Sequence, residues 1–434
     1  MSSKILRCAQ NDTLAVCWLF CCFADLKTIS KTASKSFACP NTKFVLANGT
    51  TRFQSKRFAC YFQHRVLDVR LLSPVTFPPA DFEMQRSSLN EDFAPTVFQS
   101  PLYLENYRRF FGGGKRFHAL QTGGARAWLM TRGHVLKRLE WWGAGIHDIG
   151  AASSTRFQDW PILWREIEAL AARHSMTQLA QIEAASPLVE LARSSGWQIS
   201  AAETCPLLEL TDNWDEYVAS LGKSMRDQVK RLPKRLERDF AVTHHLAKTG
   251  GETQSALDDL FRLHGKRWRA RGQTGVLVLP RRQRFQRALC DDLLKRDQLR
   301  LWTLKCDGRA VASLLFYFYN RRMSYFIGGF EPEMGKYSVG TCLFAQVIRH
   351  AIDEGAREID FLKGQEAYKY RLGATDRDYV TLENFRPGIG GDLMQRRARL
   401  EKAFMQRLHQ RFSAAHADAK PAGEKAKNTE SSTR

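Results

Sequence analysis

The sequence lacks any apolar run long enough to cross a bilayer. The best candidate, Leu14–Ala24, has about half the length that a membrane-spanning helix needs. Lys4 and Arg7 precede this run as in a secretory signal peptide, but no small-residue cleavage site follows it. We expect residues 1–83 to be an atypical leader, either disordered or ahead of the natural start at Met84, and the protein to be cytoplasmic.

Cysteine pairs of the kind that bind zinc are also missing. None of the ten cysteines forms a CxxC pair. Six of them fall in the first 60 residues: Cys8, Cys17, Cys21, Cys22, Cys39 and Cys60. The other four lie in predicted core elements, as buried thiols do in a reducing cytosol: Cys205, Cys290, Cys306 and Cys342. We therefore expect no metal cofactor.

Acidic residues are too few to balance the basic ones. There are 66 Lys and Arg against 45 Asp and Glu, a formal net charge of +21. This excess favours an anionic partner. The candidates are nucleic acid, an acidic carrier protein, a nucleotide cofactor and the anionic inner leaflet of a membrane. The 44% apolar and 26% charged content is typical of a soluble globular protein and excludes a disordered or membrane protein.

One pattern of elements is present twice. In each half, three strand signals are followed by a loop, a helix and another strand. The first copy has strands at 116–121, 127–131, 135–142 and 177–183, and its helix at 159–174. The second has strands at 299–305, 309–319, 322–330 and 358–362, and its helix at 340–354. The repeat predicts a mixed-sheet α/β (α+β) fold with two tandem domains, 97–210 and 211–412, and a disordered tail at 413–434.

Between the two copies lies a strongly basic segment, KSMRDQVKRLPKRLER (223–238), for which we expect a helix broken at Pro233. Its cations are Lys223, Arg226, Lys230, Arg231, Lys234, Arg235 and Arg238. The segment is either a solvated helix or a surface that binds CoA phosphates, a carrier protein or a tRNA backbone. Nucleic acid is the less favoured partner, because no RNA-binding module with stacked aromatics is evident. Two more helices are expected at 252–271 and 284–296.

The junction KYSVGT (336–341) leads from a loop into the predicted helix 340–354. The start of a helix presents unpaired backbone N–H groups and the positive end of the helix dipole, which together bind anions. Gly340 lets a phosphate approach closely, and Ser338 can cap the helix or donate a hydrogen bond. An ordinary capped helix explains the same residues.

Four segments together resemble the GNAT-fold acyltransferases, and more closely the CelD-like acetyltransferases associated with cellulose biosynthesis. They are LHGKRWRARGQTGVL (263–277), DGRAVASLLFYF (307–318), YFIGGFEPEMGKYSVGTCLF (325–344) and EIDFLKGQEAYKYRLG (358–373). The resemblance extends over residues 97 to 410 or so and implies two tandem GNAT-like domains. It also implies that strands 322–330 and 358–362 splay apart to admit the pantetheine arm of an acyl-CoA.

The same resemblance implies that the pyrophosphate of the acyl-CoA meets the backbone of Tyr337, Ser338, Val339, Gly340 and Thr341. In the wider GNAT pattern Gln or Arg stands in place of Tyr337, and a second small residue in place of Cys342. This departure leaves the donor open. Fem-type peptidoglycan transferases are similar in having tandem GNAT domains and a degenerate loop, and they use aminoacyl-tRNA.

Candidate catalytic side chains follow the predicted strand 358–362. Glu366 is a candidate general base, or a surface carboxylate paired with Lys363 or Lys369. Tyr368 either protonates the leaving group or packs over the edge of the sheet. Lys369, like Arg371, either binds phosphate of the cofactor or is a solvated charge.

His264 is a third catalytic candidate, because its LHxxRW context belongs to the family resemblance. It also falls on the apolar stripe of its predicted helix, which favours a partly buried, hydrogen-bonded structural histidine.

Taken together, these observations predict an acyltransferase that moves an acyl group from acetyl-CoA or another acyl-CoA to an amine. The acceptor is a small molecule or an amino sugar, used in polysaccharide or cell-envelope biosynthesis, and the enzyme associates peripherally with that machinery. Two alternatives stay open. One is a Fem-like transferase dependent on aminoacyl-tRNA, and the other a catalytically silent GNAT-fold binding protein of an exopolysaccharide assembly. No residue pattern names the acceptor.

Overall fold

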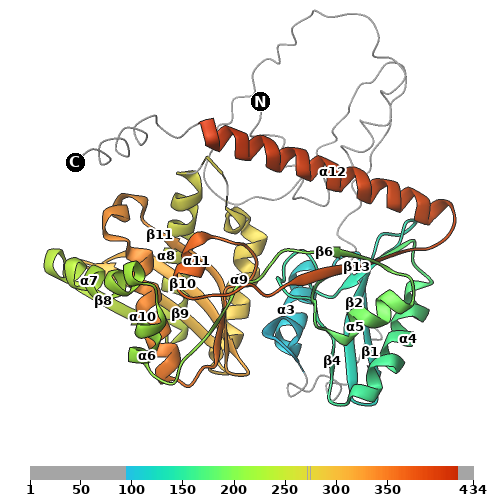
Figure 1. The fold of residues 1–434 in the computed structure, drawn as a ribbon, viewed down its shortest axis with the longest axis horizontal. Coiled ribbons are helices and arrows are strands. Elements are labelled where there is room, and N and C mark those ends of the chain that lie inside the picture. The colour runs from blue at the N-terminus through green and yellow to red at the C-terminus, as the bar shows by residue number, and fades with distance from the viewer. Residues whose placement is uncertain (1–93, 271, 274, 419–434) are drawn as a thin grey trace, which may run out of the picture. The chain divides into compact units, whose positions relative to one another are not determined.

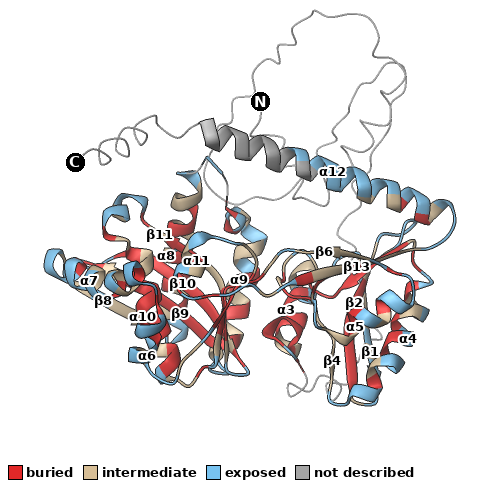
Figure 2. Cartoon of the chain, viewed as in Figure 1, coloured by how far each residue is buried: buried red, intermediate tan, exposed pale blue. Residues whose placement is uncertain are grey.

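A computed structural model describes residues 94–418 apart from 271 and 274. The predicted leader at residues 1–83 lies outside these described residues. The chain forms two β-sheets, each covered by helices (Figure 1). In Figure 2 the buried residues follow the strands and the inward sides of most of the helices.

The first sheet has seven strands in the order β1-β2-β3-β5-β13-β6, with β4 paired to β2. Its strands are β1 (Arg116–Thr122), β2 (Ala125–Arg132), β3 (Arg138–Trp141), β4 (Ser153–Ser154), β5 (Met176–Glu183), β6 (Gln198–Ala201) and β13 (Tyr379–Phe385). Helices α4 (Trp160–Ala171) and α5 (Pro187–Ser194) bury their apolar sides in one hydrophobic cluster with this sheet. Short 3-10 turns precede α3 (Pro101–Phe111) and α4, at η3 (Val97–Gln99) and η4 (Phe157–Asp159).

The second sheet has six strands in the order β7-β12-β11-β10-β9-β8. These are β7 (Leu207–Glu209), β8 (Val242–Leu246), β9 (Leu299–Cys306), β10 (Arg309–Tyr319), β11 (Arg322–Phe330) and β12 (Glu358–Asp360). The helices of this half are α6 (Trp214–Ser220), α7 (Lys223–Asp239), α8 (Gly250–Arg269), α9 (Pro280–Leu294), α10 (Val339–Asp353) and α11 (Ala367–Arg371). The 3-10 turns η5 (Val276–Val278) and η6 (Pro332–Tyr337) precede α9 and α10.

The repeated pattern is confirmed in the topology of the two sheets. In each, an antiparallel meander leads through a helix to a strand that pairs in parallel, β3 with β5 and β11 with β12. The mixed α/β class and the tandem arrangement predicted from the sequence are therefore correct. The division at residues 210 and 211 stays a prediction, and sheet membership crosses it in both directions. Strand β7 pairs with β12, and β13, from the end of the chain, pairs with β5 and β6.

Three local expectations are wrong. Helix α7 continues through Pro233, because Met225, Val229 and Leu236 bury one side of it, and this burial offsets the hydrogen bond that proline cannot donate. Strand β12 ends at Asp360 rather than Leu362, whose φ of 53° does not fit a strand. The expected disordered tail begins too early, because α12 (Ile389–Asp418) extends past residue 413. Residues 419–434 lie outside the described part of the chain.

Candidate functional site

The start of α10 has the properties of an anion site. Ser338 adopts a left-handed conformation with φ 51°, and its side chain does not cap the helix. The backbone N–H groups of Val339, Gly340 and Thr341 donate no hydrogen bond to any described residue. Three amides pointing out of a helix N-terminus can satisfy the oxygens of a phosphate.

Tyr337 packs beside this helix start instead of facing it. Its hydroxyl donates to the Asp239 carboxylate at 3.0 Å, and its buried ring lies against the Arg235 guanidinium and the Lys336 ammonium, 5.3 and 4.9 Å from the ring centroid. Only the backbone of Tyr337 is therefore available to a cofactor. The side chain ties η6 to α7, and the contact places the exposed Arg235 of α7 beside the residue that precedes Ser338.

Beyond the start of α10, β11 and β12 separate. Their parallel pairing ends at Ser324 and Asp360, and β11 continues to Phe330 paired with β10 but not with β12. Four aromatic rings occupy the space beside this part of β11: Tyr325, Phe344, Phe361 and Tyr368, with centroids 5.1 to 6.3 Å apart. A pantetheine arm between the strands must therefore pass along the rim of this cluster or displace part of it.

Tyr368 keeps its proton at neutral pH. Burial raises its pKa well above the ordinary tyrosine value, and the neighbouring Tyr325 and Glu366 add to the shift. Burial likewise raises the pKa of Tyr325 to about 12. Because Tyr368 is only half-buried, it combines a protonated hydroxyl with access to solvent. This suits a proton donor, and the packing that the sequence allowed as an alternative is also present.

Lys369 is buried, so it is not the solvated charge that the sequence allowed as an alternative to a phosphate ligand. Its side chain is 2% exposed, and its three N–H groups are shared among four consecutive carbonyl oxygens that lie 2.8 to 3.4 Å from Nζ, those of residues 361–364. Nζ also forms an ion pair of 2.9 Å with Glu366, whose side chain is 50% exposed. The geometry gives Lys369 the role of closing the turn after β12 and leaves it no donor for a phosphate. For Glu366, the ion pair with a lysine that the sequence allowed is present.

His264 lies against β11 on α8. Its Nδ1 is 3.3 Å from the carbonyl oxygen of Gly328, and its Nε2 is buried with no hydrogen-bond partner among the described residues. Burial lowers the pKa of His264 to about 4, so the ring is neutral at physiological pH. The close packing depends on Gly329, where a Cβ atom would come within 2.3 Å of the His264 backbone nitrogen. The structural role that its helical stripe favoured thus accounts for its position.

Sequence reasoning missed Asp148, which lies in the loop after β3. Its carboxylate is 3.8 Å from the Lys363 ammonium, so it joins the first half of the chain to the turn after β12. Burial raises its pKa, although Lys363 and then Lys369 oppose the shift, and part of its side chain stays exposed. A partly exposed carboxylate with a raised pKa is a candidate for proton transfer. No motif marked it, because its neighbours come from residues far along the chain.

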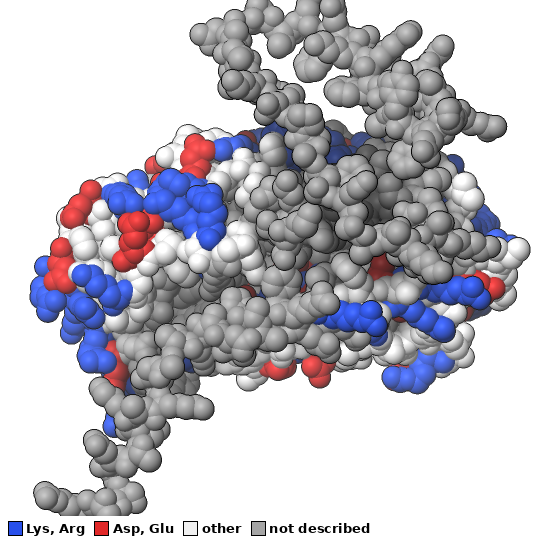
Figure 3. All heavy atoms as spheres, turned by 90° about the horizontal axis from the view of Figure 1, so that it is seen from above, with Lys and Arg blue, Asp and Glu red and all other residues white. Residues whose placement is uncertain are grey.

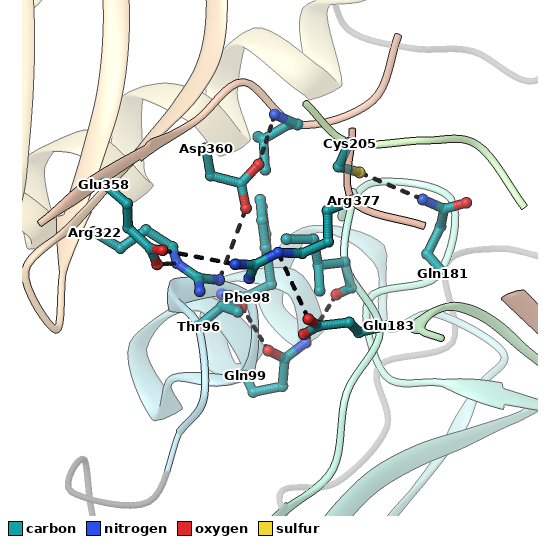
Figure 4. Close-up of polar contacts among 12 residues, drawn as sticks. Thr96, Phe98, Gln99, Gln181, Glu183, Cys205, Arg322, Glu358, Asp360 and Arg377 are labelled. Carbon is teal, nitrogen blue, oxygen red and sulfur yellow. Dashed lines mark hydrogen bonds and ion pairs between the residues drawn. The ribbon is translucent and has the colours of Figure 1, made fainter. Parts of the chain in front are cut away.

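The two sheets are also joined by a network of charges around β11 and β12, in which Asp360 is buried and the other members are partly exposed. Arg322 pairs with Glu358 and lies 3.8 Å from Asp360, while Arg377 reaches Glu358 at 3.9 Å and Glu183 at 3.6 Å (Figure 4). Burial raises the pKa of Asp360 to about 6, against the opposing effects of Arg322 and the Leu362 amide. This network holds β12 of the second sheet against β5 of the first.

The residues predicted for the site thus lie around β11 and the turn after β12. Their roles in the structure differ from one another. Glu366, Tyr368 and Lys369 share the turn after β12, and Tyr368 stacks on Phe344 in the first turns of α10. Tyr325 connects this group to Arg267 of α8, the helix that carries His264. Val339, Gly340 and Thr341 present the backbone amides of the predicted anion site, whereas the Ser338 amide donates to the Gly335 carbonyl.

A cavity of about 420 Å³ lies elsewhere, between α12 and the first sheet. Among the described residues, no helix is long and apolar enough to cross a membrane, and no group of three or more His, Cys, Asp or Glu side chains could hold a metal ion.

Comparison with known proteins supports a GNAT-type fold for the half of the chain that contains the second sheet. Residues 223–370 match the family model described as an acetyltransferase (GNAT) domain. No curated protein matches the sequence. The crystal structure of FemX is similar at TM-score 0.54 and 11% identity, covering 69% of this chain and 94% of that one, which shows a shared fold.

Two further structures reach only a TM-score of 0.45. One is the C-terminal domain of a putative lysylphosphatidylglycerol synthetase from Agrobacterium fabrum, at 14% identity, covering 64% of this chain and 86% of that one. The other is L-PGS from Bacillus licheniformis, at 15% identity, covering 65% and 91%. The match over residues 223–370 and the topology of the second sheet together show that the chain contains a GNAT-type acetyltransferase domain.

Proposed function

We propose that this protein transfers an acyl group from acyl-CoA to an amine acceptor, in the biosynthesis of a polysaccharide or of the cell envelope as in the CelD-like family. One observation carries the proposal. Within the GNAT-type domain, the amides of Val339, Gly340 and Thr341 have no partner among the described residues, and the exposed Arg235 of α7 lies against the preceding Tyr337. Phosphate groups of CoA would satisfy those amides and be attracted by that cation.

The chemistry requires a proton acceptor for the incoming amine and a proton donor for the leaving thiolate. Tyr368 is the proposed donor, because burial keeps its hydroxyl protonated. Two carboxylates compete for the other role. Glu366 already holds Lys369 in an ion pair, whereas Asp148 has a raised pKa and a looser partner in Lys363. We favour Asp148 as the group that receives the proton, and Glu366 as a group that positions the turn.

Binding of acetyl-CoA, measured by calorimetry, tests the donor site. A Cβ atom at Gly340 would make only ordinary contact with Phe330, so Gly340→Val is expected to fold while its side chain crowds the amides. We expect this variant to bind acetyl-CoA roughly tenfold more weakly. Gly335→Val is the matched control, because a Cβ atom there meets nothing within 4 Å. If the wild type does not bind acetyl-CoA, or if both variants bind it equally, the proposed donor site is wrong.

The acceptor side is tested with a panel of amines once binding is established. Asp148→Asn is expected to lower kcat by roughly 100-fold, and Glu366→Gln by much less. If acetyl-CoA binds, no acceptor consumes it and neither variant changes behaviour in cells, the catalytically silent alternative is favoured.

A second candidate is Fem-like transfer from aminoacyl-tRNA. The fold shared with FemX and the cations exposed along α7 favour it. Thermal stabilisation by aminoacyl-tRNA but not by acetyl-CoA would support this donor. In that case Lys230→Gln with Lys234→Gln should weaken tRNA binding and reduce its dependence on salt.

A further inference from the structure

The last described helix, α12, turns its large apolar side chains outward. Ile389, Leu393, Leu400 and Phe404 are 81%, 49%, 70% and 42% exposed. Their spacing of four, seven and four residues places them on one side of a helix with 3.6 residues per turn. Figure 2 shows most of the described part of α12 in the colour of exposed residues. We call these four residues the outer stripe.

The opposite side of α12, which faces the first sheet, buries fewer apolar side chains than the inward side of an ordinary helix does. Met394 is the one large apolar side chain that it buries among the described residues of the helix. The strands beneath it present polar side chains, among them Gln178, Thr381 and Glu383, and a cavity of about 420 Å³ separates them from the helix. Packing of α12 against the sheet therefore buries little apolar surface. This packing gives no reason for the four large apolar side chains on the other side of the helix.

Cations flank the outer stripe on both sides. On a helical projection Arg396, Arg397 and Arg407 all lie within roughly 50° of its centre. The acidic residues Asp392 and Glu401 lie farther from it, and Glu401 already pairs with Arg397 at 2.7 Å. Figure 3 views the molecule from the side on which Figure 1 draws α12, and Lys and Arg stand out there among the described atoms.

We propose that the outer stripe of α12 docks on an anionic lipid surface. The helix would lie in the plane of the interface, with its apolar side chains among the acyl chains and its arginines at the phosphates. Charge complementarity selects this occupant over a second copy of the chain. Antiparallel or parallel pairing of two outer stripes would bring the same arginines together and repel. The proposal is independent of which acyl donor the enzyme uses.

Flotation of the full-length protein with vesicles tests this docking. The vesicles contain phosphatidylcholine with roughly one-third phosphatidylglycerol, and the reference vesicles contain phosphatidylcholine alone. The test variant is Leu400→Ser with Phe404→Ser, which removes apolar surface and leaves the net charge unchanged. The matched control is Phe157→Ser with Ile162→Ser, on η4 and α4, where both side chains are also exposed.

We expect the wild type and the control to float with the anionic vesicles and not with the reference vesicles. The Leu400/Phe404 variant should partition at least roughly tenfold more weakly. The proposal is overturned if the wild type does not bind anionic vesicles, or if the variant binds as well as the control. It is equally overturned if the wild type self-associates in sedimentation without binding vesicles and the variant is monomeric, because a second copy then covers the stripe.

Discussion

Replacing Lys369 by methionine gives the most direct test of how the turn after β12 is held. The substitution keeps a long side chain in the same buried space but removes the ammonium group. The carbonyls of Phe361 and Leu362 are fully buried and lose donors at 3.0 and 3.4 Å, while those of Lys363 and Gly364 are partly buried. The turn itself has left-handed residues at Leu362 and Gly364, so its shape depends on those hydrogen bonds.

The size of the effect follows from two opposing contributions. Two buried carbonyls without partners cost about 1–3 kcal/mol each in free energy of unfolding. Removing a buried ammonium returns part of its desolvation cost. Glu366 is half exposed, so water can solvate its carboxylate once Lys369 is gone, and it adds little. We therefore expect Lys369→Met to destabilise the protein by about 2–4 kcal/mol.

Lys363→Met is the matched control, because Lys363 is partly exposed and lies 3.8 Å from Asp148. We expect it to cost less than about 1 kcal/mol. The assays are urea unfolding and hydrogen exchange of the peptide that spans residues 358–373. The exchange measurement reports the turn directly, even if the two halves unfold in separate steps. If Lys369→Met matches its control in both assays, the four carbonyl contacts do not stabilise the turn.

Three further outcomes are expected. Gly329→Ala should destabilise the protein by at least about 1–3 kcal/mol in urea unfolding, because its Cβ atom would lie 2.3 Å from the backbone nitrogen of His264, and an unchanged midpoint would show that α8 can move away. The folded pKa of Asp360, about 6, lies above the unfolded value near 3.8, so its contribution to stability is present at low pH and lost as the pH rises from about 4 to 6. Relative to Asp360→Asn, the wild type should therefore lose roughly 2–3 kcal/mol between these limits, and a constant difference would exclude the shift. Tyr368→Phe should lower kcat roughly 10- to 100-fold with little change in KM, whereas a variant that changes only stability would indicate that the phenol merely packs.

Much of the fold could be predicted from local patterns. Alternating apolar residues and the Asp307-Gly308 turn locate β9 and β10, and the one-sided apolar stripe locates α10 to within a residue at each end. Such signals work because strand and helix periodicities are properties of neighbouring residues. Pro233 shows the limit, since a local rule predicts a break where burial of three apolar residues keeps α7 continuous.

Part of the candidate site could also be predicted from local sequence, and part could not. The proposal of an anion site at residues 339–341 depends only on the start of one helix, and local sequence is enough to predict that start. The roles of Lys369 and Asp148 do not follow, because each depends on atoms brought in by other segments. Lys369 turns inward to four carbonyls, and Asp148 meets a lysine from the opposite half of the chain.

The sequence by itself determined the order of strands and helices, their repetition, the start of α10 and the concentration of reactive side chains after β12. Tertiary structure alone decided that β7 and β13 each pair in the sheet of the other half, and that arginines 322 and 377 join the two sheets. It also decided that Lys369 stabilises a turn and that α12 exposes its apolar side. The physical reason is that hydrogen bonds, ion pairs and burial between distant segments depend on distances that no local pattern of residues contains.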